Sequence, residues 1–119
     1  MRKTKLGRIL ADGGGRTLYV FERDRGRRST CYGSCAQLWP PFTTTTDVLP
    51  ASNGILTRLL GASRRTDRSD NVTYAGHPLY FYGFDEGPGD MRGQGVRDFG
   101  GRWWAISPSG RVLRGSGSS

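Results

Sequence analysis

The sequence is poor in the residues on which most catalytic and metal-binding classes depend. Its 119 residues include one histidine and two cysteines. A structural zinc site takes about four ligands, so the chain lacks a conventional zinc-binding set. No apolar run approaches the roughly 20 residues of a membrane-spanning helix, which excludes a transmembrane protein of that kind. Leucine, isoleucine, valine and phenylalanine together make up just under a fifth of the chain, a level near which highly charged chains are suspected of disorder.

Aromatic residues and glycine are abundant where aliphatic residues are scarce. The chain has three tryptophans and five tyrosines, and each large ring can bury about 150–250 Å² of surface. Its 19 glycines interrupt every apolar run, which excludes a coiled coil or a long helical bundle. The composition therefore predicts one folded, loop-rich domain with an aromatic core.

Positive charge is carried almost entirely by arginine, and the formal net charge is +8. The planar guanidinium binds two phosphate oxygens at once, so a nucleic acid or another anionic polymer is a reasonable partner. A basic surface that only reflects arginine-rich codon usage is the alternative. The candidate anion-binding residues form two groups in predicted loops: Arg23, Arg25, Arg27 and Arg28, and Arg64, Arg65 and Arg68. Aspartates interrupt both groups, which weakens the case for phosphate binding.

Cys31 and Cys35 form a CxxxC segment. This spacing differs from the CxxC of redox dithiols, and a structural disulfide is the simplest interpretation. A disulfide across so short a loop adds only about 2 kcal/mol, so it would pin a local loop. Free thiols at a metal or redox site, with His77 as a further ligand, are the alternative. Residues 1–11 begin like a signal peptide, but Arg8 interrupts the apolar part, so no signal peptide is predicted.

Short apolar and aromatic segments predict β-hairpins. The predicted hairpins are residues 6–11 with 17–21, 72–74 with 79–82, and 103–106 with 111–113. Residues 17–21 are apolar on both faces, which predicts a central strand. A helical turn or two is expected in the cysteine segment and residues 36–39, and a short helix or packed loop at 55–60, whereas 63–71 is predicted to be an exposed loop.

Two of these segments contain the same short sequence motif. The form Tyr-x-aromatic-x-x-Asp occurs at Tyr19, Phe21 and Asp24, and again at Tyr80, Tyr82 and Asp85. Each copy follows a turn and a leucine, which suggests two related halves around one core. The aspartate at the strand's end could accept backbone N–H groups and close the next loop. A surface where the Tyr–Asp pairs converge on a cation or a polar ligand is the functional alternative.

Few other residues could take part in catalysis or in binding a ligand. His77, in a Gly-His-Pro turn, is the only histidine available as a base, and no nucleophile motif accompanies it. Asp90 and its acidic neighbours could bind a cation, but their spacing does not match an EF-hand loop. Trp39, before two prolines, could be an exposed aromatic platform or a core residue. These three are possible ligand-binding residues, and we expect no catalytic residue, metal or cofactor.

Taken in order, these segments resemble a known family, the secreted lipoprotein-repeat family described by a Tyr-x-(Phe/Trp/Tyr)-x-x-Asp motif. The segments that carry the resemblance are residues 6–12, 15–24, 29–36, 39–41, 72–80, 87–95 and 100–110. The resemblance implies an exported or cell-envelope domain with no established enzyme activity. It also favours the disulfide between Cys31 and Cys35.

The sequence thus predicts a mostly β, single small domain of β-hairpins in two pseudo-repeated halves, with at most one or two short helices. The domain is expected over residues 1–114, with halves at about 6–61 and 62–114 and a flexible tail at 115–119. The predicted core consists of Leu18, Tyr19, Val20, Phe21, Trp39, Leu79, Tyr80, Phe81, Trp103 and Ile106.

The predicted function is a non-enzymatic binding or interaction domain outside the cytoplasm, secreted or in the cell envelope. Its ligand is unknown, and an anionic polymer or a cell-envelope component is a candidate partner. Two alternatives stand beside it: binding of nucleic acid or anionic polymers through the arginine groups, and a metal or redox protein that uses the CxxxC pair. A cytoplasmic location also stays open, because no signal peptide is predicted.

Overall fold

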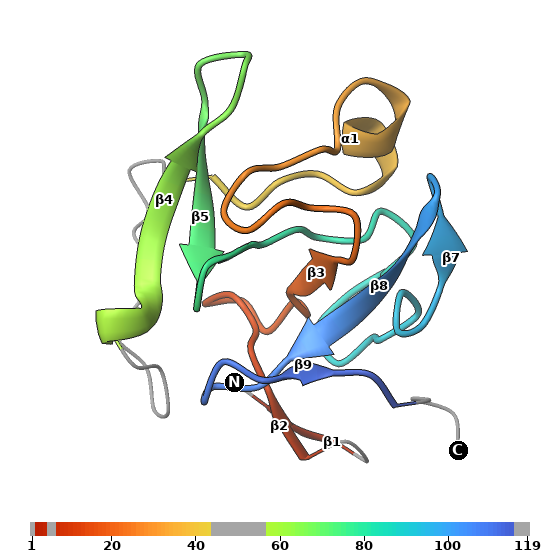
Figure 1. The fold of residues 1–119 in the computed structure, drawn as a ribbon. Helices are drawn as coiled ribbons and strands as arrows, with labels where there is room; N and C mark the ends of the chain where they lie inside the picture. Colours follow the sequence, from red (N-terminus) through yellow and green to blue (C-terminus); the bar gives the residue numbers. More distant parts are fainter. Residues whose placement is uncertain (1, 5–6, 44–56, 116–119) are drawn as a thin grey trace.

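The computed structural model describes residues 2–4, 7–43 and 57–115, and it is mostly β (Figure 1). The elements are β1 (Arg2–Thr4), β2 (Gly7–Ile9), β3 (Tyr19–Phe21), α1 (Ser34–Leu38), the 3₁₀ turn η1 (Thr57–Leu59), β4 (Leu60–Arg64), β5 (Asp70–Tyr74), β6 (His77–Pro78), β7 (Arg97–Asp98), β8 (Gly101–Ile106) and β9 (Val112–Leu113). The strands pair antiparallel in sheets of two, four and three strands. The predicted fold class is confirmed.

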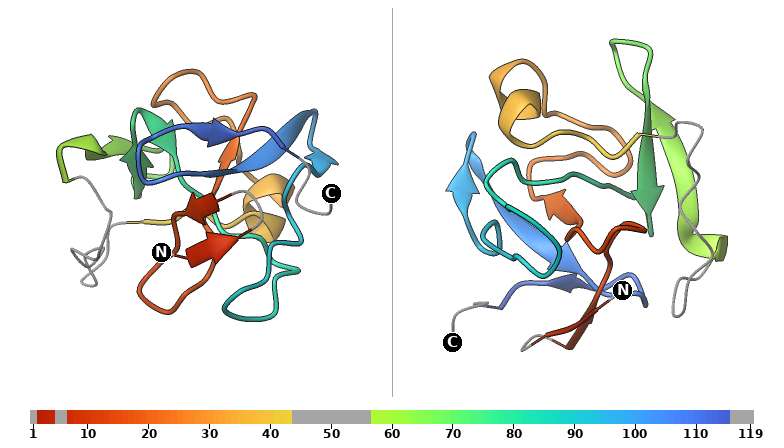
Figure 2. Two further views of the ribbon diagram at one scale, coloured as in Figure 1. Left: turned by 90° about the horizontal axis from the view of Figure 1, so that it is seen from below. Right: turned by 180° about the vertical axis from the view of Figure 1, so that it is seen from behind.

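β3 lies at the centre of the fold, as its two apolar faces predict. On one side it pairs with β8, with Tyr19 opposite Ala105 and Phe21 opposite Trp103. On the other side the Tyr19 N–H donates to the Tyr80 carbonyl at 2.8 Å, and the Tyr80 N–H donates to the Tyr19 carbonyl at 2.9 Å. The view from behind in Figure 2 shows β3 between β8 and β5. Because both of its edges are paired, β3 joins the two halves of the chain.

The two motif copies have equivalent surroundings. Residues 38–42 run along the second copy as residues 102–106 of β8 run along the first. The equivalent backbone bonds are Gly83 N–H to Leu38 C=O (2.7 Å) and Glu22 N–H to Arg102 C=O (3.0 Å), then Val72 N–H to Phe42 C=O (2.7 Å) and Leu10 N–H to Ile106 C=O (2.8 Å). Each copy is thus flanked by a segment from the opposite half of the chain. The pseudo-repeated halves are intertwined and do not lie side by side as separate units.

Four aromatic rings stack between the two copies and form one part of the core. The stack runs Phe21, Trp103, Trp39, Tyr82, with neighbouring centroids 4.0, 3.9 and 4.0 Å apart. The two motif tyrosines stand edge-on to the tryptophans, Tyr19 to Trp39 at 5.6 Å and Tyr80 to Trp103 at 5.1 Å. Such pairs contribute about 0.5–1.5 kcal/mol each beyond the area they bury. The stack therefore ties one half of the chain to the other.

A glycine makes room for this stack. A Cβ atom at Gly93 would lie 2.9 Å from ring atoms of Trp39 and 2.9 Å from the ring of Tyr19. Real Cβ contacts are longer than this, so any side chain at Gly93 would push the rings apart.

The predicted core is largely confirmed. The buried members are Leu18, Tyr19, Val20, Phe21, Trp39, Leu79, Tyr80, Trp103 and Ile106. Phe81 is only partly buried, and the guanidinium of Arg16 lies over its ring at 5.1 Å. The core also contains Leu10, Val72 and Tyr74, which the sequence analysis placed in strands without assigning them to the core.

One local prediction is wrong and another is confirmed only in part. Residues 63–71, expected as an exposed loop, contain the end of β4 and the start of β5, which pair from Leu60 with Tyr74 to Arg64 with Asp70. Backbone bonds hold this hairpin, so it needs little apolar side-chain content. The first predicted hairpin is formed only near its turn, by the Ala11–Thr17 bridge and the bonds from Leu18 N–H to Leu10 C=O and from Asp12 N–H to Arg16 C=O; its outer residues lie in β2, which pairs with β1, and in β3, which pairs with β8.

The third hairpin is present as β8 and β9. The second is present with a tighter turn than predicted: β5 pairs with β6 at His77–Pro78, and within the expected strand 79–82 Tyr80 pairs instead with Tyr19 and Pro41. The helix expected at the cysteine segment is α1. Of the helix expected at 55–60, η1 covers 57–59. Residues 6, 55–56 and 116–119 of the sequence predictions lie outside the described residues. Within the described residues, no helix has the length and apolar character needed to cross a bilayer.

Candidate functional site

The two motif copies bind each other through crossed hydrogen bonds. The Tyr19 hydroxyl donates to Asp85 Oδ2 at 2.7 Å, and the Tyr80 hydroxyl donates to Asp24 Oδ2 at 2.7 Å. Each tyrosine therefore binds the aspartate of the other copy and not that of its own. Hydrogen bonds to a carboxylate are among the stronger ones in proteins, at about 1.5–3 kcal/mol net.

The second oxygen of each aspartate closes the loop that follows it. Asp24 Oδ1 accepts from the Thr30 N–H at 2.8 Å, and Asp85 Oδ1 accepts from the Arg92 N–H at 2.8 Å. This is the loop closure expected from an aspartate at a strand's end. Burial raises the pKa of both carboxyl groups, although the tyrosine and backbone bonds oppose that rise.

Each motif tyrosine hydroxyl has a second hydrogen-bond partner besides its aspartate. The Gly93 N–H donates to the Tyr19 hydroxyl at 3.1 Å. Ser29 Oγ and the Tyr80 hydroxyl lie 2.6 Å apart. Burial also raises the pKa of Tyr80. The Tyr–Asp pairs do converge, but they converge on one another, and their polar atoms are used to hold the two halves together.

Cys31 and Cys35 form a disulfide in the structure, with an S–S distance of 2.06 Å. Both cysteines are buried in the cluster that contains the aromatic stack. The predicted disulfide is confirmed. Because the two sulfurs are bonded to each other, neither is a thiolate ligand for a metal. The described residues also contain no group of three or more His, Cys, Asp or Glu that could hold a metal ion.

The structure separates the seven candidate arginines by role. Arg65 is buried, with 3% exposure, and donates to Ser29 Oγ at 2.8 Å, to Asn71 Oδ1 at 3.1 Å and to the Cys31 carbonyl. It is a core residue that holds the cysteine segment to β5, and it offers no charge to an outside anion. Exposed members of the two groups are Arg23, Arg25, Arg27, Arg28, Arg64 and Arg68.

The hydrogen bonds of the exposed groups differ. Arg64 Nε binds Asp70 Oδ1 at 2.7 Å across the β4–β5 hairpin, so its charge is partly neutralised. Arg25 and Arg28 bond to each other's backbone and make a tight turn. Asp24, which interrupts this group in the sequence, turns inward to Tyr80. The turn at residues 23–28 therefore presents arginines without a facing acid of its own.

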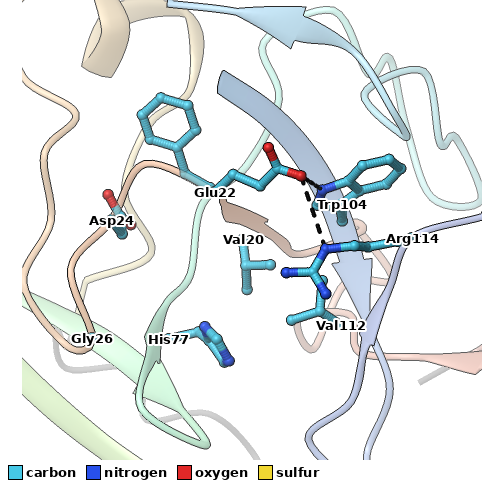
Figure 3. Close-up of a pocket in the computed structure, with 9 residues that line it drawn as sticks. Val20, Glu22, Asp24, Gly26, His77, Trp104, Val112 and Arg114 are labelled. Atoms are coloured by element: carbon cyan, nitrogen blue, oxygen red, sulfur yellow. Dashed lines mark hydrogen bonds and ion pairs between the residues drawn. The ribbon is translucent and has the colours of Figure 1, made fainter. Parts of the chain in front are cut away.

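A small hollow lies beside Trp104, on the face of β3 and β8 away from the aromatic stack (Figure 3). Its cavity volume is about 90 Å³, and Figure 3 shows the side chains that surround it. The lining residues are Val20, Phe21, Glu22, Asp24, Gly26, His77, Trp104, Val112 and Arg114. Successive strand residues point to opposite faces, so Trp104 faces this hollow whereas Trp103 faces the stack.

Charged and polar groups frame the hollow. Trp104 Nε1 donates to Glu22 Oε2 at 2.7 Å, and Arg114 Nε lies 3.9 Å from the same oxygen. Burial, and to a smaller extent the positive charge of Arg114, lower the pKa of His77. His77 is therefore neutral at neutral pH, and the local charge comes from Glu22, Asp24 and Arg114.

The three possible ligand-binding residues have different positions. His77 lines the hollow. Trp39 is completely buried in the stack, with its Nε1 3.2 Å from Asp98 Oδ2, so it offers no surface to a ligand. Asp90 Oδ2 accepts from the Glu86 N–H at 2.7 Å and closes its own turn. Sequence reasoning missed Glu22, Trp104 and Arg114, although the strand alternation after Trp103 is a signal that Trp104 lies on another face.

Comparison with known proteins identifies a family but no individual relative. The family described as a secreted repeat of unknown function matches residues 1–43 and 62–107, about three quarters of the chain. Searches of the curated proteins and of the solved structures each found no match.

Proposed function

This chain belongs to the family of secreted repeats, and from that premise we propose that it is a non-enzymatic interaction domain that works outside the cytoplasm. The proposed binding site is the hollow beside Trp104, where Glu22, His77 and Arg114 meet. The family's description as secreted and the disulfide both support a place outside the cytoplasm, because stable disulfides persist in oxidising compartments.

The size of the hollow carries this proposal. Pockets for small-molecule substrates measure about 300–1,000 Å³, and this hollow measures about 90 Å³. A site of this size accepts one side chain of a partner, in the way that a pocket at a protein interface accepts an anchor residue. The polar groups of the motif support the same view, because the crossed bonds use them for architecture.

A second candidate function is binding of an anionic polymer at the turn of residues 23–28. The observation that favours it is the inward orientation of Asp24, which leaves Arg23, Arg25, Arg27 and Arg28 exposed around one turn. Retention on heparin that falls linearly with salt on a log–log plot, and that neutralising Arg25, Arg27 and Arg28 weakens, would support it. Equal retention of the neutralised variant would exclude this turn.

Site-specific photocrosslinking tests the interaction proposal. We would place a photoreactive residue at Arg114, at the rim of the hollow, and as a control at Arg64 on the β4–β5 hairpin. The two side chains are similarly exposed, at 63% and 67%. A partner from the cell envelope or the culture medium should be captured from position 114 and not from position 64.

The captured partner must then act at the hollow. When purified partner is titrated into the domain, the indole N–H resonance of Trp104 should shift while that of buried Trp39 stays unchanged. Equal capture from both positions, or a partner that leaves Trp104 unchanged, would overturn the proposed site. A turnover that the His77→Ala substitution abolishes would overturn the non-enzymatic assignment.

A further inference from the structure

The two halves of the chain build the same turn after each motif, which allows the two surroundings to be compared. The Asp24 N–H donates to the Phe21 carbonyl at 3.1 Å, and the Asp85 N–H donates to the Tyr82 carbonyl at 3.1 Å. The same backbone groups therefore stand at the same places in both halves. The side chains around these two turns can therefore be compared position by position.

Beside the turn of the second motif copy, the space is filled by Arg16, which comes from the first half of the chain. Arg16 Nη2 lies 3.4 Å from the Tyr82 carbonyl and 3.5 Å from the Asp85 carbonyl, and its guanidinium lies 5.1 Å from the centre of the Phe81 ring. A guanidinium is planar and donates up to five hydrogen bonds, so it can bridge two carbonyls while it covers an aromatic face.

Beside the turn of the first motif copy, the equivalent residue is His77 from the second half of the chain, and it is too short to do this. His77 precedes Tyr80 by three residues, as Arg16 precedes Tyr19. His77 lines the hollow together with Phe21 and Asp24, the counterparts of Tyr82 and Asp85. The hollow is thus the counterpart of the space that the Arg16 guanidinium occupies in the other half.

Size and charge agree with this comparison. The hollow of about 90 Å³ exceeds the roughly 10–15 Å³ that one water needs on this measure, so it has room for a group of several heavy atoms. Glu22 stands where the second half has Gly83, and Trp104 Nε1 fixes its carboxylate at the hollow. The first half therefore adds a negative charge where the second half has none.

We propose that the hollow beside Trp104 binds the guanidinium group of an arginine side chain presented by a partner polypeptide. The proposal rests on the proposed function and names the chemistry that this site recognises. Glu22 would pair with the guanidinium, and the turn of Phe21 and Asp24 would accept its N–H groups. Arg114, which is exposed and 3.9 Å from Glu22, is a weak surface ion pair that the incoming group displaces.

The chain offers a matched pair of variants, because each half can be given the other half's residue. His77→Arg places a guanidinium in the hollow and should block it. Arg16→His removes the internal guanidinium and should open a second hollow, which keeps the Tyr82 and Asp85 carbonyls but has Gly83 in place of Glu22. The probe is Nα-acetyl-arginine methylamide, with Nα-acetyl-lysine methylamide and Nα-acetyl-norleucine methylamide as controls for charge and for the aliphatic stem.

Binding is measured from the indole N–H resonances, of which the chain has three. With the arginine probe the Trp104 resonance should shift with a dissociation constant of the order of 1 mM, as expected for one side chain. His77→Arg should weaken this binding at least tenfold, and Arg114→Ala should strengthen it. Arg16→His should add a second probe site that binds more weakly than the first, because Gly83 supplies no carboxylate there.

Three results would overturn the proposal: equal binding of the arginine and norleucine probes, unchanged binding by His77→Arg, or no shift of Trp104. If Arg16→His does not fold, His77→Arg decides alone, because it adds a side chain to an open hollow. Lysine or norleucine binding that His77→Arg blocks would refute the guanidinium preference and leave the proposed function standing. Loss of all probe binding together with no capture at position 114 would refute both.

The Trp104 indole resonance also distinguishes the two possible sources of the arginine, a second copy of this chain and another polypeptide. If a second copy of this chain supplies it, the Trp104 resonance shifts as the protein is concentrated without a probe, and His77→Arg abolishes that shift. If another polypeptide supplies it, the resonance is independent of protein concentration and moves only when that polypeptide is added.

Discussion

The crossed Tyr–Asp bonds predict a specific pattern of energetic coupling. Tyr19 binds Asp85 and not Asp24, although Asp24 belongs to its own motif copy. In double-mutant cycles, Tyr19→Phe and Asp85→Ala should therefore be strongly coupled. Tyr19→Phe and Asp24→Ala should be nearly additive. The mirror cycle of Tyr80 with Asp24 should repeat the strong coupling.

The expected magnitude follows from the geometry. The Tyr19 hydroxyl is buried and lies 2.7 Å from Asp85 Oδ2, and such a bond to a charged group contributes about 1.5–3 kcal/mol. Tyr19→Phe also loses the bond from the Gly93 N–H, but the cycle subtracts this loss because it occurs with and without Asp85. The coupling energy across copies should thus be about 1.5–3 kcal/mol, against less than about 0.5 kcal/mol within a copy.

Urea unfolding of the single and double variants measures both cycles at one pH. Intrinsic fluorescence is a suitable signal, because two tryptophans lie in the stack that unfolding exposes. The midpoint and the slope are both needed, since a change in slope would indicate a changed denatured state. Coupling within a copy that equals or exceeds coupling across copies would refute the crossed arrangement.

The same aspartates predict the sign of a pH effect. Burial raises the pKa of Asp24 and Asp85 in the folded protein above the ordinary value of 3.8. A raised folded-state pKa means that the folded state binds the proton more tightly. The contribution of each carboxyl to stability is therefore complete below about pH 3.8 and is lost as the pH rises through the folded pKa.

The wild-type protein should accordingly gain stability relative to Asp24→Asn and Asp85→Asn as the pH falls from 7 towards 4. Urea midpoints across that range, taken as differences from each variant, remove the contributions of the other carboxylates. A wild-type protein that loses stability relative to both variants would show that the hydrogen bonds outweigh burial and that the pKa values are lowered.

Three further changes probe single contacts. Gly93→Ala should lower the free energy of unfolding in urea by about 1–3 kcal/mol, because its Cβ would lie 2.9 Å from two aromatic rings. The control Gly87→Ala has open space around it and should change stability by less than about 0.5 kcal/mol. Equal effects of the two substitutions would contradict the close approach at Gly93. Arg65→Met should cost more than about 2 kcal/mol in the same assay, because it removes one donor from each of three buried oxygens, and a neutral effect would mean that the side chain lies outside the core. Replacing Cys31 and Cys35 by serine should lower the free energy of unfolding by about 2 kcal/mol without unfolding the domain. For the unsubstituted protein, an intact mass equal to that of the reduced chain would show that no disulfide was present.

The sequence predicted those features that depend on neighbouring residues: a central strand, a hairpin and two loop closures. The aromatic strand of residues 17–21 is apolar on both faces, so a central, doubly paired strand follows from its composition. The third hairpin follows from two short β-rich segments around a Ser-Pro-Ser-Gly turn. The aspartate at the end of each motif copy was expected to close a loop, and Asp24 and Asp85 both accept backbone N–H groups.

Long-range partners could not be predicted in the same way. The spacing within each motif copy suggests a local Tyr–Asp unit, and nothing in the sequence says that the partners are exchanged between copies. Arg65 sits among exposed arginines in the sequence, and only the fold shows that it reaches Ser29 and the Cys31 carbonyl. The β4–β5 hairpin was missed because its side chains are polar and backbone pairing holds it.

Because the crossed Tyr–Asp bonds hold the two motif copies together, the surroundings of the two copies can differ at the hollow without a loss of stability. The crossed bonds and the aromatic stack need the motif residues in both copies, so those positions are bound by the architecture. The residues three positions before each motif tyrosine, Arg16 and His77, lie outside these contacts. At the second motif copy the guanidinium of Arg16 fills the space beside the turn, and at the first copy the shorter His77 leaves the equivalent space open to a guanidinium from outside.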